Sequence, residues 1–410
     1  MMSYKIKDLV FIVDGAAKSC IYDCNENRTY WIDHETSSFF RRVVNNRLEL
    51  NDSGLVETAK SMNLIEESTD EQIQSWPDIE DYIVSPRNME FAWIELTNQC
   101  NLRCTHCYNE TLYRKKKKMT FEDFVYVVDE LKHFGIKEVQ LIGGEPFMLD
   151  EDELFKILAY ASKSFRGFEV FFNGTMTSKQ QLERIKDEFP NCKIALSLHS
   201  FIREEHEKIT QIDGSYDKTV ETLHNLQELK MPFRYVGIYA AGIKVGKELD
   251  FGVPYKRDYI RLTGRGNLSH YDRRLLLEKI TTPERLKFHD LTEALKDNYK
   301  DSCFANYLYI GCDLNVYPCV MERRLCHGNL RNKALSEIID NKIINLSKKE
   351  VDECNECEFR YLCKDCRPDS LSDNPMAKPW YCSYDVYKGE WTDKETFVNN
   401  IINANQKTTS

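Results

Sequence analysis

Three cysteines on one short segment are the residues of this chain whose type and spacing point most directly to chemistry. Cys100, Cys104 and Cys107 follow one another in the pattern C-x3-C-x2-C. A structural zinc site needs four protein ligands, whereas three thiolates can hold three corners of a cubic [4Fe–4S] cluster. The triplet therefore predicts a cluster whose fourth iron is left open to a small molecule.

The segments around the triplet indicate how it is positioned. Apolar runs at 91–96 and 139–142 are typical of short buried strands, and residues 121–134 carry apolar side chains at helical spacing behind the N-cap residue Thr120. Strand, helix and strand form one βαβ unit. The second run leads into Gly143-Gly144-Glu145-Pro146. Glycines let the backbone approach a ligand, although a Gly-Gly pair by itself is more often a turn.

The alternation of strands and helices continues through the middle of the chain. We expect strands at 168–172, 193–198, 233–239 and 259–262, and helices at 151–162, 179–188 and 216–229. With the two strands already placed, this pattern predicts six βα units with parallel strands. Chemistry in such folds gathers where the strands end, which directs attention to Asn173 and Ser197. A plain turn at Asn173-Gly174 and a buried hydroxyl at Ser197 are the competing interpretations.

A second set of cysteines is concentrated in the last third of the chain. Its members are Cys303, Cys312, Cys319, Cys354, Cys357, Cys363, Cys366 and Cys382. Eight thiolates suit two four-cysteine iron–sulfur clusters, while zinc is the competing interpretation because C-x2-C pairs also occur in zinc ribbons. Of the other cysteines, Cys20 and Cys24 are expected in the core, and Cys192 and Cys326 have no evident partner.

Taken together, these motifs resemble those of radical S-adenosylmethionine (radical SAM) enzymes with a C-terminal SPASM domain. The resemblance rests on the triplet, on the GGEP sequence one strand later, and on the cysteine pattern of the last third. It implies a partial (β/α)6 TIM-type barrel and three [4Fe–4S] clusters, with S-adenosylmethionine (SAM) chelating the open iron of the first. The short gap between Cys363 and Cys366 is similar to that of a subset of peptide-maturing SPASM enzymes.

The resemblance also implies roles for individual residues. Gly143, Gly144 and Glu145 would receive the amino group of SAM, His106 would pack beside its adenine, and Asn173 and Ser197 would lie near it. The loop Gly264-Arg265-Gly266 is similar to the late adenine-side loop of the family. No catalytic side chain is assigned.

Ligand sets for the two auxiliary clusters follow from the same resemblance. The first cluster would take Cys303, Cys319 and Cys366, with Cys312 as a candidate fourth ligand. The second cluster would take Cys354, Cys357, Cys363 and Cys382. The sequence departs from the family at Leu314, where glycine is usual, and at the Cys363–Cys366 gap, which is one residue shorter than the common form.

The remaining segments suggest further domains. Residues 1–66 combine alternating strands over 8–33 with helical patterns at 34–44 and 55–62, which favours a winged-helix-like module for a leader peptide over a capping or dimerising domain. We expect a linker at 67–90, the barrel at 91–275, a helical bridge at 276–302, the SPASM domain at 303–393 and a polar tail at 394–410.

Composition excludes several classes of protein. The formal net charge of −10 argues against a general nucleic-acid-binding or anionic-membrane surface. No apolar stretch reaches the roughly 20 residues needed to span a bilayer, and no signal peptide is evident. We expect a cytoplasmic protein whose cysteines bind metal rather than form disulfides.

These features favour a maturase for ribosomally synthesised peptides. The resemblance implies that a 5′-deoxyadenosyl radical abstracts hydrogen from a precursor peptide and that a crosslink follows, with a thioether as the first choice. Partners would be the precursor with its leader and a reductant such as flavodoxin or ferredoxin. The alternatives are carbon–carbon or carbon–oxygen crosslinking, formylglycine formation in a sulfatase, or a SPASM protein that binds peptide or metal without catalysis.

Overall fold

A sheet of nine strands forms the centre of the molecule. The structure is a computed structural model that describes residues 3–69, 75–83, 89–109, 115–298, 302–370 and 373–408. In spatial order the sheet contains β11 (Lys256–Tyr259), β10 (Phe233–Tyr239), β9 (Cys192–Ser197), β8 (Gly167–Phe172), β7 (Glu138–Gly143), β6 (Phe91–Thr97), β12 (Tyr307–Ile310), β13 (Asn315–Tyr317) and β14 (Gly328–Asn329).

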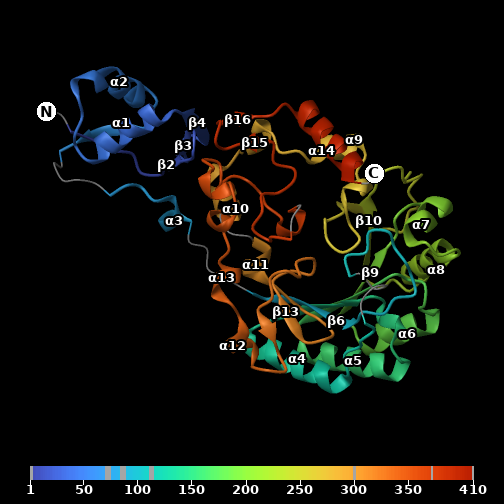
Figure 1. Cartoon of the computed structure of the whole chain (residues 1–410). Helices are drawn as coiled ribbons and strands as arrows, with labels where there is room; N and C mark the ends of the chain where they lie inside the picture. Colours follow the sequence, from blue (N-terminus) through green and yellow to red (C-terminus); the bar gives the residue numbers. More distant parts are fainter. Residues whose placement is uncertain are drawn as a thin grey trace.

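The six strands β6 to β11 are parallel and follow one another in sequence order. Their connections include α4 (Phe121–Phe134), α5 (Glu151–Ser164), α6 (Lys179–Glu188), α7 (Arg203–Thr210) and α8 (Ser215–Glu228). Figure 1 places α4, α5, α6 and α8 along one side of the sheet and the red segments near β15 and β16 on the other. The predicted α/β class with a parallel sheet is confirmed. The described strands do not close into a ring, which is compatible with a partial barrel.

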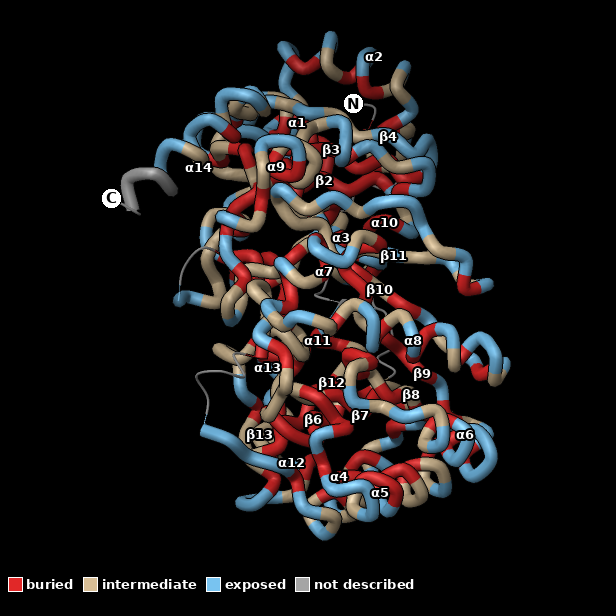
Figure 2. Tube along the Cα trace, turned by 90° about the vertical axis from the view of Figure 1, so that its right-hand side faces the viewer, coloured by how far each residue is buried: buried red, intermediate tan, exposed pale blue. Residues whose placement is uncertain are grey.

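Local sequence explains why these elements begin and end as they do. The hydroxyl of Thr120 accepts a hydrogen bond of 3.1 Å from the backbone N–H of Asp123, and Gly135 ends α4 with a φ of 100°. Apolar residues of the strands and helices then meet in one large core, as the red strands of Figure 2 show. Cys192 lies in this core, while Cys20 and Cys24 are buried near the N-terminus.

The C-terminal cysteine segments extend the same sheet rather than forming a separate body. Strand β12 pairs in parallel with β6, and β13 and β14 continue the sheet with antiparallel pairing. Leu314, which stands where the family has glycine, has a φ of 66° in the turn between β12 and β13. Glycine is the usual residue here because this backbone conformation is strained for residues with a Cβ.

Residues 3–69 form a module of two small sheets and two helices. Strands β2 (Val10–Asp14), β3 (Ser19–Asp23) and β4 (Arg28–Ile32) make an antiparallel sheet, and β1 (Ser3–Ile6) pairs with β5 (Ile65–Ser68). The helices are α1 (His34–Val44) and α2 (Ser53–Ser61). The strand region and both helices lie where the sequence predicts them.

Two of the expected connecting segments contain more structure than the sequence suggests. The expected linker includes the short helix α3 (Ile79–Tyr82), where Ile79 and Ile83 are buried, while residues 70–74 and 84–88 of that linker lie outside the described residues. The expected tail was wrong over its described part, because residues 394–408 form α14 (Lys394–Thr408). Val398 of α14 is buried against Leu275 and Leu276 of α9 (Arg273–Lys279).

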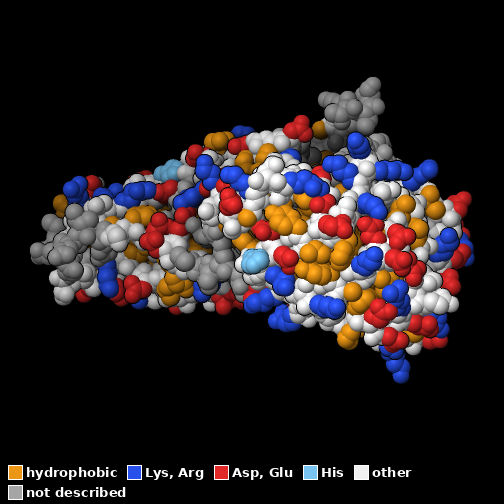
Figure 3. Space-filling view, turned by 90° about the horizontal axis from the view of Figure 1, so that it is seen from below, with side chains coloured by type: hydrophobic (Ala, Val, Ile, Leu, Met, Phe, Trp, Pro, Cys, Tyr) orange, Lys and Arg blue, Asp and Glu red, His pale blue; other side chains and the backbone are white. Residues whose placement is uncertain are grey.

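Small elements complete the C-terminal third. They are α10 (Leu291–Asn298), α11 (Ser302–Asn306), α12 (Leu335–Ile338), α13 (Asn341–Ile344), β15 (Tyr384–Asp385) and β16 (Glu390–Trp391). Figure 3, seen from below, shows acidic and basic side chains intermingled over the broad end of the molecule. None of the helices in the described ranges is long and apolar enough to cross a membrane.

Candidate functional site

The cysteine triplet lies on the loop that leaves β6, beside the loop that leaves β7. The backbone N–H of Gly144 donates to the carbonyl of Thr97 at 2.6 Å, and that of Glu145 donates to the carbonyl of Gln99 at 2.7 Å. A Cβ on Gly144 would stand only 2.0 Å from the carbonyl oxygen of Gln99. Glycine is therefore needed here for backbone packing, in addition to the approach to a ligand that the sequence suggested.

A cavity at this edge of the sheet gathers most of the predicted site residues. It is lined by Cys100, Leu102, Cys104, His106, Cys107, Tyr108, Asn109, Gly143, Gly144, Phe171, Phe172, Asn173, Ser197, His199, Thr210 and Arg265. The carboxyl ends of parallel strands meet at one edge, which is why residues far apart in sequence converge there.

The chemistry of the three thiols suits an iron–sulfur cluster. Burial, with a further contribution from Glu145, raises the pKa of Cys100 to about 12, and burial raises that of Cys104 as well. Thiols in such surroundings become thiolates when a metal supplies positive charge. Within the described residues, no three His, Cys, Asp or Glu side chains gather around a single metal-ion position, whereas a cubic cluster holds its cysteines at separate corners.

The carboxylate of Glu145 is engaged by backbone groups beside the cavity. The side chain is fully buried and does not line the cavity. One carboxylate oxygen accepts a bond of 3.0 Å from the N–H of Phe147, and the other accepts a bond of 2.8 Å from the N–H of Asn173. Burial raises its pKa to about 7, although these hydrogen bonds oppose the shift. Glu145 thus ties the loop after β7 to the end of β8.

Asn173 and His106 both face the cavity. The amide nitrogen of Asn173 donates to Oδ1 of Asn101 at 2.9 Å and lies 3.9 Å from Sγ of Cys100. His106 packs edge-on against His199 with ring centroids 5.0 Å apart. Burial, followed by the charges of His270 and Arg265, lowers the pKa of His106 to about 3, so its ring is neutral near pH 7.

Arg265 is one of the cavity residues to which the sequence analysis gave no role of their own. Its backbone N–H donates to the carbonyl of Cys107 at 3.0 Å. A Cβ on Gly264, whose φ is 58°, would approach that carbonyl to 2.6 Å. Nε and Nη2 of Arg265 are buried without a hydrogen-bond partner. Its position between two glycines after the sixth strand was the available signal, because glycines there indicate a tightly packed loop.

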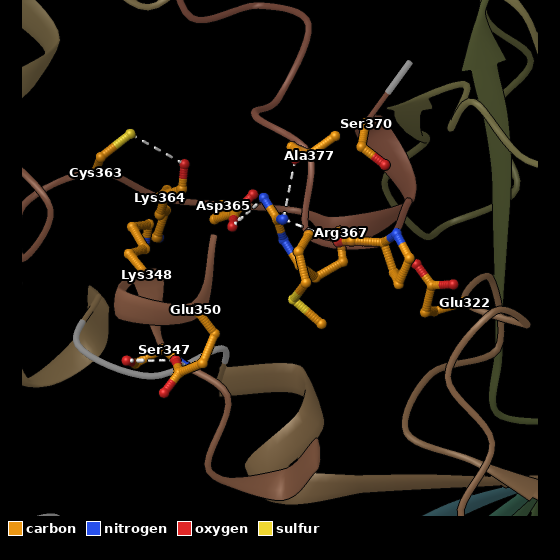
Figure 4. A network of polar contacts seen from close by, with 12 residues as sticks. Glu322, Ser347, Lys348, Glu350, Cys363, Lys364, Asp365, Arg367, Ser370 and Ala377 are labelled. Atoms are coloured by element: carbon orange, nitrogen blue, oxygen red, sulfur yellow. Dashed lines mark hydrogen bonds and ion pairs between the residues drawn. The ribbon is translucent and has the colours of Figure 1, made fainter. Parts of the chain in front are cut away.

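Four cysteines of the C-terminal set lie close together. Burial is the main cause that raises the pKa of Cys354, Cys357 and Cys363, and in each case the neighbouring Cys382 raises it further. The fully buried Arg367, which lies between Cys363 and Cys382 in the sequence, forms an ion pair of 2.5 Å with Asp365 (Figure 4). These are the four cysteines that the resemblance to SPASM enzymes implies as the ligands of one cluster.

The other C-terminal cysteines are distributed over several elements. Cys303 lies exposed on α11, and Cys319 packs in a small apolar cluster with Phe304. Cys312 instead lies in the core of the large sheet, where its backbone N–H donates to Glu95 at 3.1 Å. Cys366 lies near Arg261, whose pKa it raises against the effect of burial.

Sequence comparison relates the central part of the chain to a known superfamily. A sequence model of the radical SAM superfamily matches residues 94–243. The subtilosin biosynthesis protein AlbA of Bacillus subtilis is 23% identical over 323 residues, which are 72% of this chain and 70% of AlbA. The sporulation killing factor maturation protein SkfB of the same organism is 24% identical over 139 residues, which are 34% of this chain and 33% of SkfB. The match to SkfB therefore spans about a third of either protein.

Solved structures share the fold over a larger part of the chain. SuiB of Streptococcus suis, bound to its precursor peptide SuiA, superposes with a TM-score of 0.55 over 92% of this chain and 98% of that chain, at 14% identity. The structure of native anSMEcpe with bound AdoMet gives a TM-score of 0.53 over 76% of this chain and 99% of that chain, at 16% identity. The superfamily model matches the part of the chain that carries the triplet, the two glycines and most of the parallel sheet, so residues 94–243 are similar to a radical SAM domain.

Proposed function

We propose that this enzyme matures a ribosomally synthesised precursor peptide by abstracting hydrogen from it and installing an intramolecular crosslink, most directly a thioether. The observation that carries the proposal is the convergence of the triplet, Gly143 and Gly144 on one cavity in a chain that aligns with AlbA over 72% of its length. AlbA serves in the biosynthesis of the bacteriocin subtilosin, and SkfB in maturation of the sporulation killing factor.

The cavity supplies the groups that a cluster and SAM require. Cys100, Cys104 and Cys107 would hold a [4Fe–4S] cluster, and on reduction this cluster and its bound SAM supply a 5′-deoxyadenosyl radical that takes hydrogen from a substrate carbon. The unpaired guanidinium nitrogens of Arg265 suit the carboxylate of SAM. The neutral ring of His106 suits an adenine edge, and the apolar walls at Phe171 and Phe172 exclude water.

The C-terminal cysteines would hold two auxiliary clusters in a SPASM domain. The mutual electrostatic influence of Cys354, Cys357, Cys363 and Cys382 supports one four-cysteine site. Cys303, Cys319 and Cys366 would hold the other. Cys312 packs in the core of the sheet, which supports a first auxiliary cluster that is held by the other three cysteines only. One iron of that cluster would then be open to a thiolate of the substrate. A thioether forms from one C–H and one S–H bond with loss of two hydrogens, and an auxiliary cluster is a suitable electron acceptor.

The N-terminal module would bind the leader segment of the precursor. Within the described ranges, β4 of the three-stranded sheet pairs only with β3, so its other edge carries no described strand, and Trp31 on β4 is 47% exposed. An extended leader peptide can add to such an edge as a further strand. The basic residues 115–118, which follow the triplet loop, are all exposed and would attract a flavodoxin or ferredoxin reductant in the cytoplasm.

Co-expression with the small peptides encoded beside this protein tests the proposal. Mass spectrometry should find a peptide that has lost two hydrogens per crosslink and whose cysteine no longer reacts with iodoacetamide. Changing Cys104 to Ala should abolish the product. A peptide that loses two hydrogens but keeps a reactive thiol would exclude the thioether and favour carbon–carbon or carbon–oxygen crosslinking, and unmodified peptides in every case would refute a maturase role.

A further inference from the structure

A second pocket adjoins the SAM cavity. It is lined by residues 262–264 and 266–268 after β11, by residues 321–324 after Cys319, and by Pro368, Ser370 and Asp373 after Cys366. Gly264 and Gly266 line this pocket, whereas Arg265 between them lines the cavity with the triplet. The same loop therefore lines both the second pocket and the cavity with the triplet. A molecule in the second pocket would lie next to SAM bound in that cavity.

One of the two arginines in this pocket is fully engaged by the protein. Arg324 forms two hydrogen bonds to Glu322, one of 2.9 Å from Nε and one of 2.6 Å from Nη2. It also donates to Ser370 Oγ at 2.6 Å and to the carbonyl of Arg367 at 2.7 Å. Its charge is neutralised by Glu322, which is 1% exposed, and Arg324 thereby joins two cysteine segments. This residue has a structural role.

The other arginine, Arg323, is held in place but has no anion. Its Nη2 donates to the hydroxyl of Tyr309 at 2.6 Å, and its guanidinium lies 4.0 Å from the centre of the Tyr309 ring and 5.3 Å from that of Tyr317. Its Nε is buried without a hydrogen-bond partner. In the described part of the chain, no carboxylate lies within the 4.0 Å that defines an ion pair with Arg323.

The nearby acidic residues do not supply the missing partner. Glu95 acts on the charge of Arg323, but one of its oxygens accepts from Asn109 at 2.6 Å and the other from the backbone of Cys312 at 3.1 Å. Asp373, the remaining carboxylate of the pocket, is exposed and forms no described ion pair with Arg323. A largely buried guanidinium without an anion is costly, and a planar carboxylate is the group that best matches its fork of donors.

We propose that this pocket binds a carboxylate of the peptide substrate through Arg323 and so presents the neighbouring residue to the SAM cavity. The inference rests on the proposed function in taking the substrate to be a peptide. The carboxylate belongs either to an Asp or Glu side chain or to the C-terminus of the peptide, because Arg323 would recognise both by the same chemistry. Arg323 is already oriented by Tyr309 and Tyr317, so little ordering is needed on binding.

Small probes test the pocket independently of any precursor. Holoenzyme with SAM would be titrated with three small probes, and their binding would be followed by ligand-observed NMR. N-acetyl-aspartate N-methylamide represents an acidic side chain, and N-acetyl-alanine represents a C-terminus. N-acetyl-asparagine N-methylamide is the neutral control. We expect at least one acid to bind about tenfold or more tightly than the amide, as suits a charge-assisted pair. Which acid binds identifies the source of the carboxylate.

Variants assign this binding to Arg323. In Arg323→Gln the preference for the acid should disappear, and in Arg323→Lys, which keeps the charge but not the planar fork, it should be reduced. Arg274→Gln is the matched control, because Arg274 is exposed on α9 and pairs with Glu278 of the same helix. Iron content and circular dichroism verify folding. Equal binding of acids and amide, no binding of either, or unchanged preference in Arg323→Gln would overturn the proposal.

Failure of the two proposals can be told apart. If the acids bind more tightly than the amide and this preference depends on Arg323, but no precursor is modified, the pocket proposal stands and the peptide-maturase proposal fails. If precursors are modified but acid and amide bind equally, the peptide-maturase proposal stands and the pocket proposal fails.

Discussion

At the scale of single residues, the site depends on backbone positions that tolerate no Cβ. Gly144 brings the loop after β7 against the triplet loop, and Gly264 brings the loop after β11 against Cys107. The sequence predicted one site that contains the triplet, Gly143, Gly144, Glu145, His106, Asn173 and Ser197, and all of these residues except Glu145 line the cavity. The unpaired nitrogens of Arg265 could not be predicted, because pairing depends on groups that only the fold brings near.

Gly144→Ala tests this packing. The new Cβ would lie 2.0 Å from the carbonyl oxygen of Gln99, so the triplet loop must move. A displacement of about 1 Å can lower the rate of a reaction more than tenfold. We therefore expect the rate of 5′-deoxyadenosine formation to fall at least about tenfold. Gly54→Ala is the control, because nothing lies within 4 Å of its Cβ in α2; it should raise stability by about 0.5–1 kcal/mol. Equal rates for both variants would contradict the packing argument.

Leu314→Gly weighs backbone strain against burial. Glycine would relieve the left-handed conformation at a φ of 66°, which costs about 1–2 kcal/mol for a residue with a Cβ. The same change removes a side chain that is 1% exposed, and truncation of a buried leucine costs about 2–5 kcal/mol. Burial is the larger effect, so denaturant unfolding should show a net loss of stability. A more stable variant would show that strain is the larger one.

At the scale of elements, strongly patterned segments were predicted well and weakly patterned ones were missed. Helix α4 has the predicted bounds because Thr120 and Gly135 mark both ends. Strand β12 is only four residues long and lies between cysteines, so its periodicity could not be recognised. Helix α14 was taken for a tail because its apolar residues are interspersed with asparagines, which conceal the face that packs on α9.

Val398→Ala tests whether α14 is part of the core. Val398 is fully buried, so we expect a loss of about 1–3 kcal/mol in the free energy of unfolding from the lost burial. Asn400→Ala, in the same helix at an exposed position, should leave stability within about 0.5 kcal/mol of the wild type. Should Val398→Ala behave like the Asn400 variant, the helix would not be docked in solution.

At the scale of the whole molecule, the N-terminal module packs on the loop that carries Cys354 and Cys357. The backbone N–H of Ala16 donates to the carbonyl of Glu356 at 2.8 Å. The hydroxyl of Tyr22 donates to the backbone carbonyl of Glu358. A Cβ on Gly15 would lie 2.8 Å from the backbone nitrogen of Glu358. Figure 1 accordingly shows the blue module beside β15 and β16. Sequence patterns could not predict this contact, because it joins residues more than 300 positions apart.

Gly15→Ala should loosen the contact between the module and the cysteine loop. We expect slower crosslinking of a precursor while SAM cleavage without peptide stays unchanged, because the triplet cavity is formed by other elements. Tyr22→Phe removes one hydrogen bond without adding a clash and should have a smaller effect. The rate of crosslinking and the rate of 5′-deoxyadenosine formation without peptide would be measured side by side. If both rates fall together in Gly15→Ala, the substitution does not act only through the contact of the module.

The central claim is that the radical generated at the triplet takes hydrogen from a peptide. Its most direct test is the deuterium content of the 5′-deoxyadenosine formed when the anaerobic holoenzyme acts on a fully deuterated precursor. We expect deuterium in 5′-deoxyadenosine together with a crosslinked peptide, and neither product in the Cys107→Ala variant. Formation of 5′-deoxyadenosine without deuterium, beside an unmodified precursor, would contradict it.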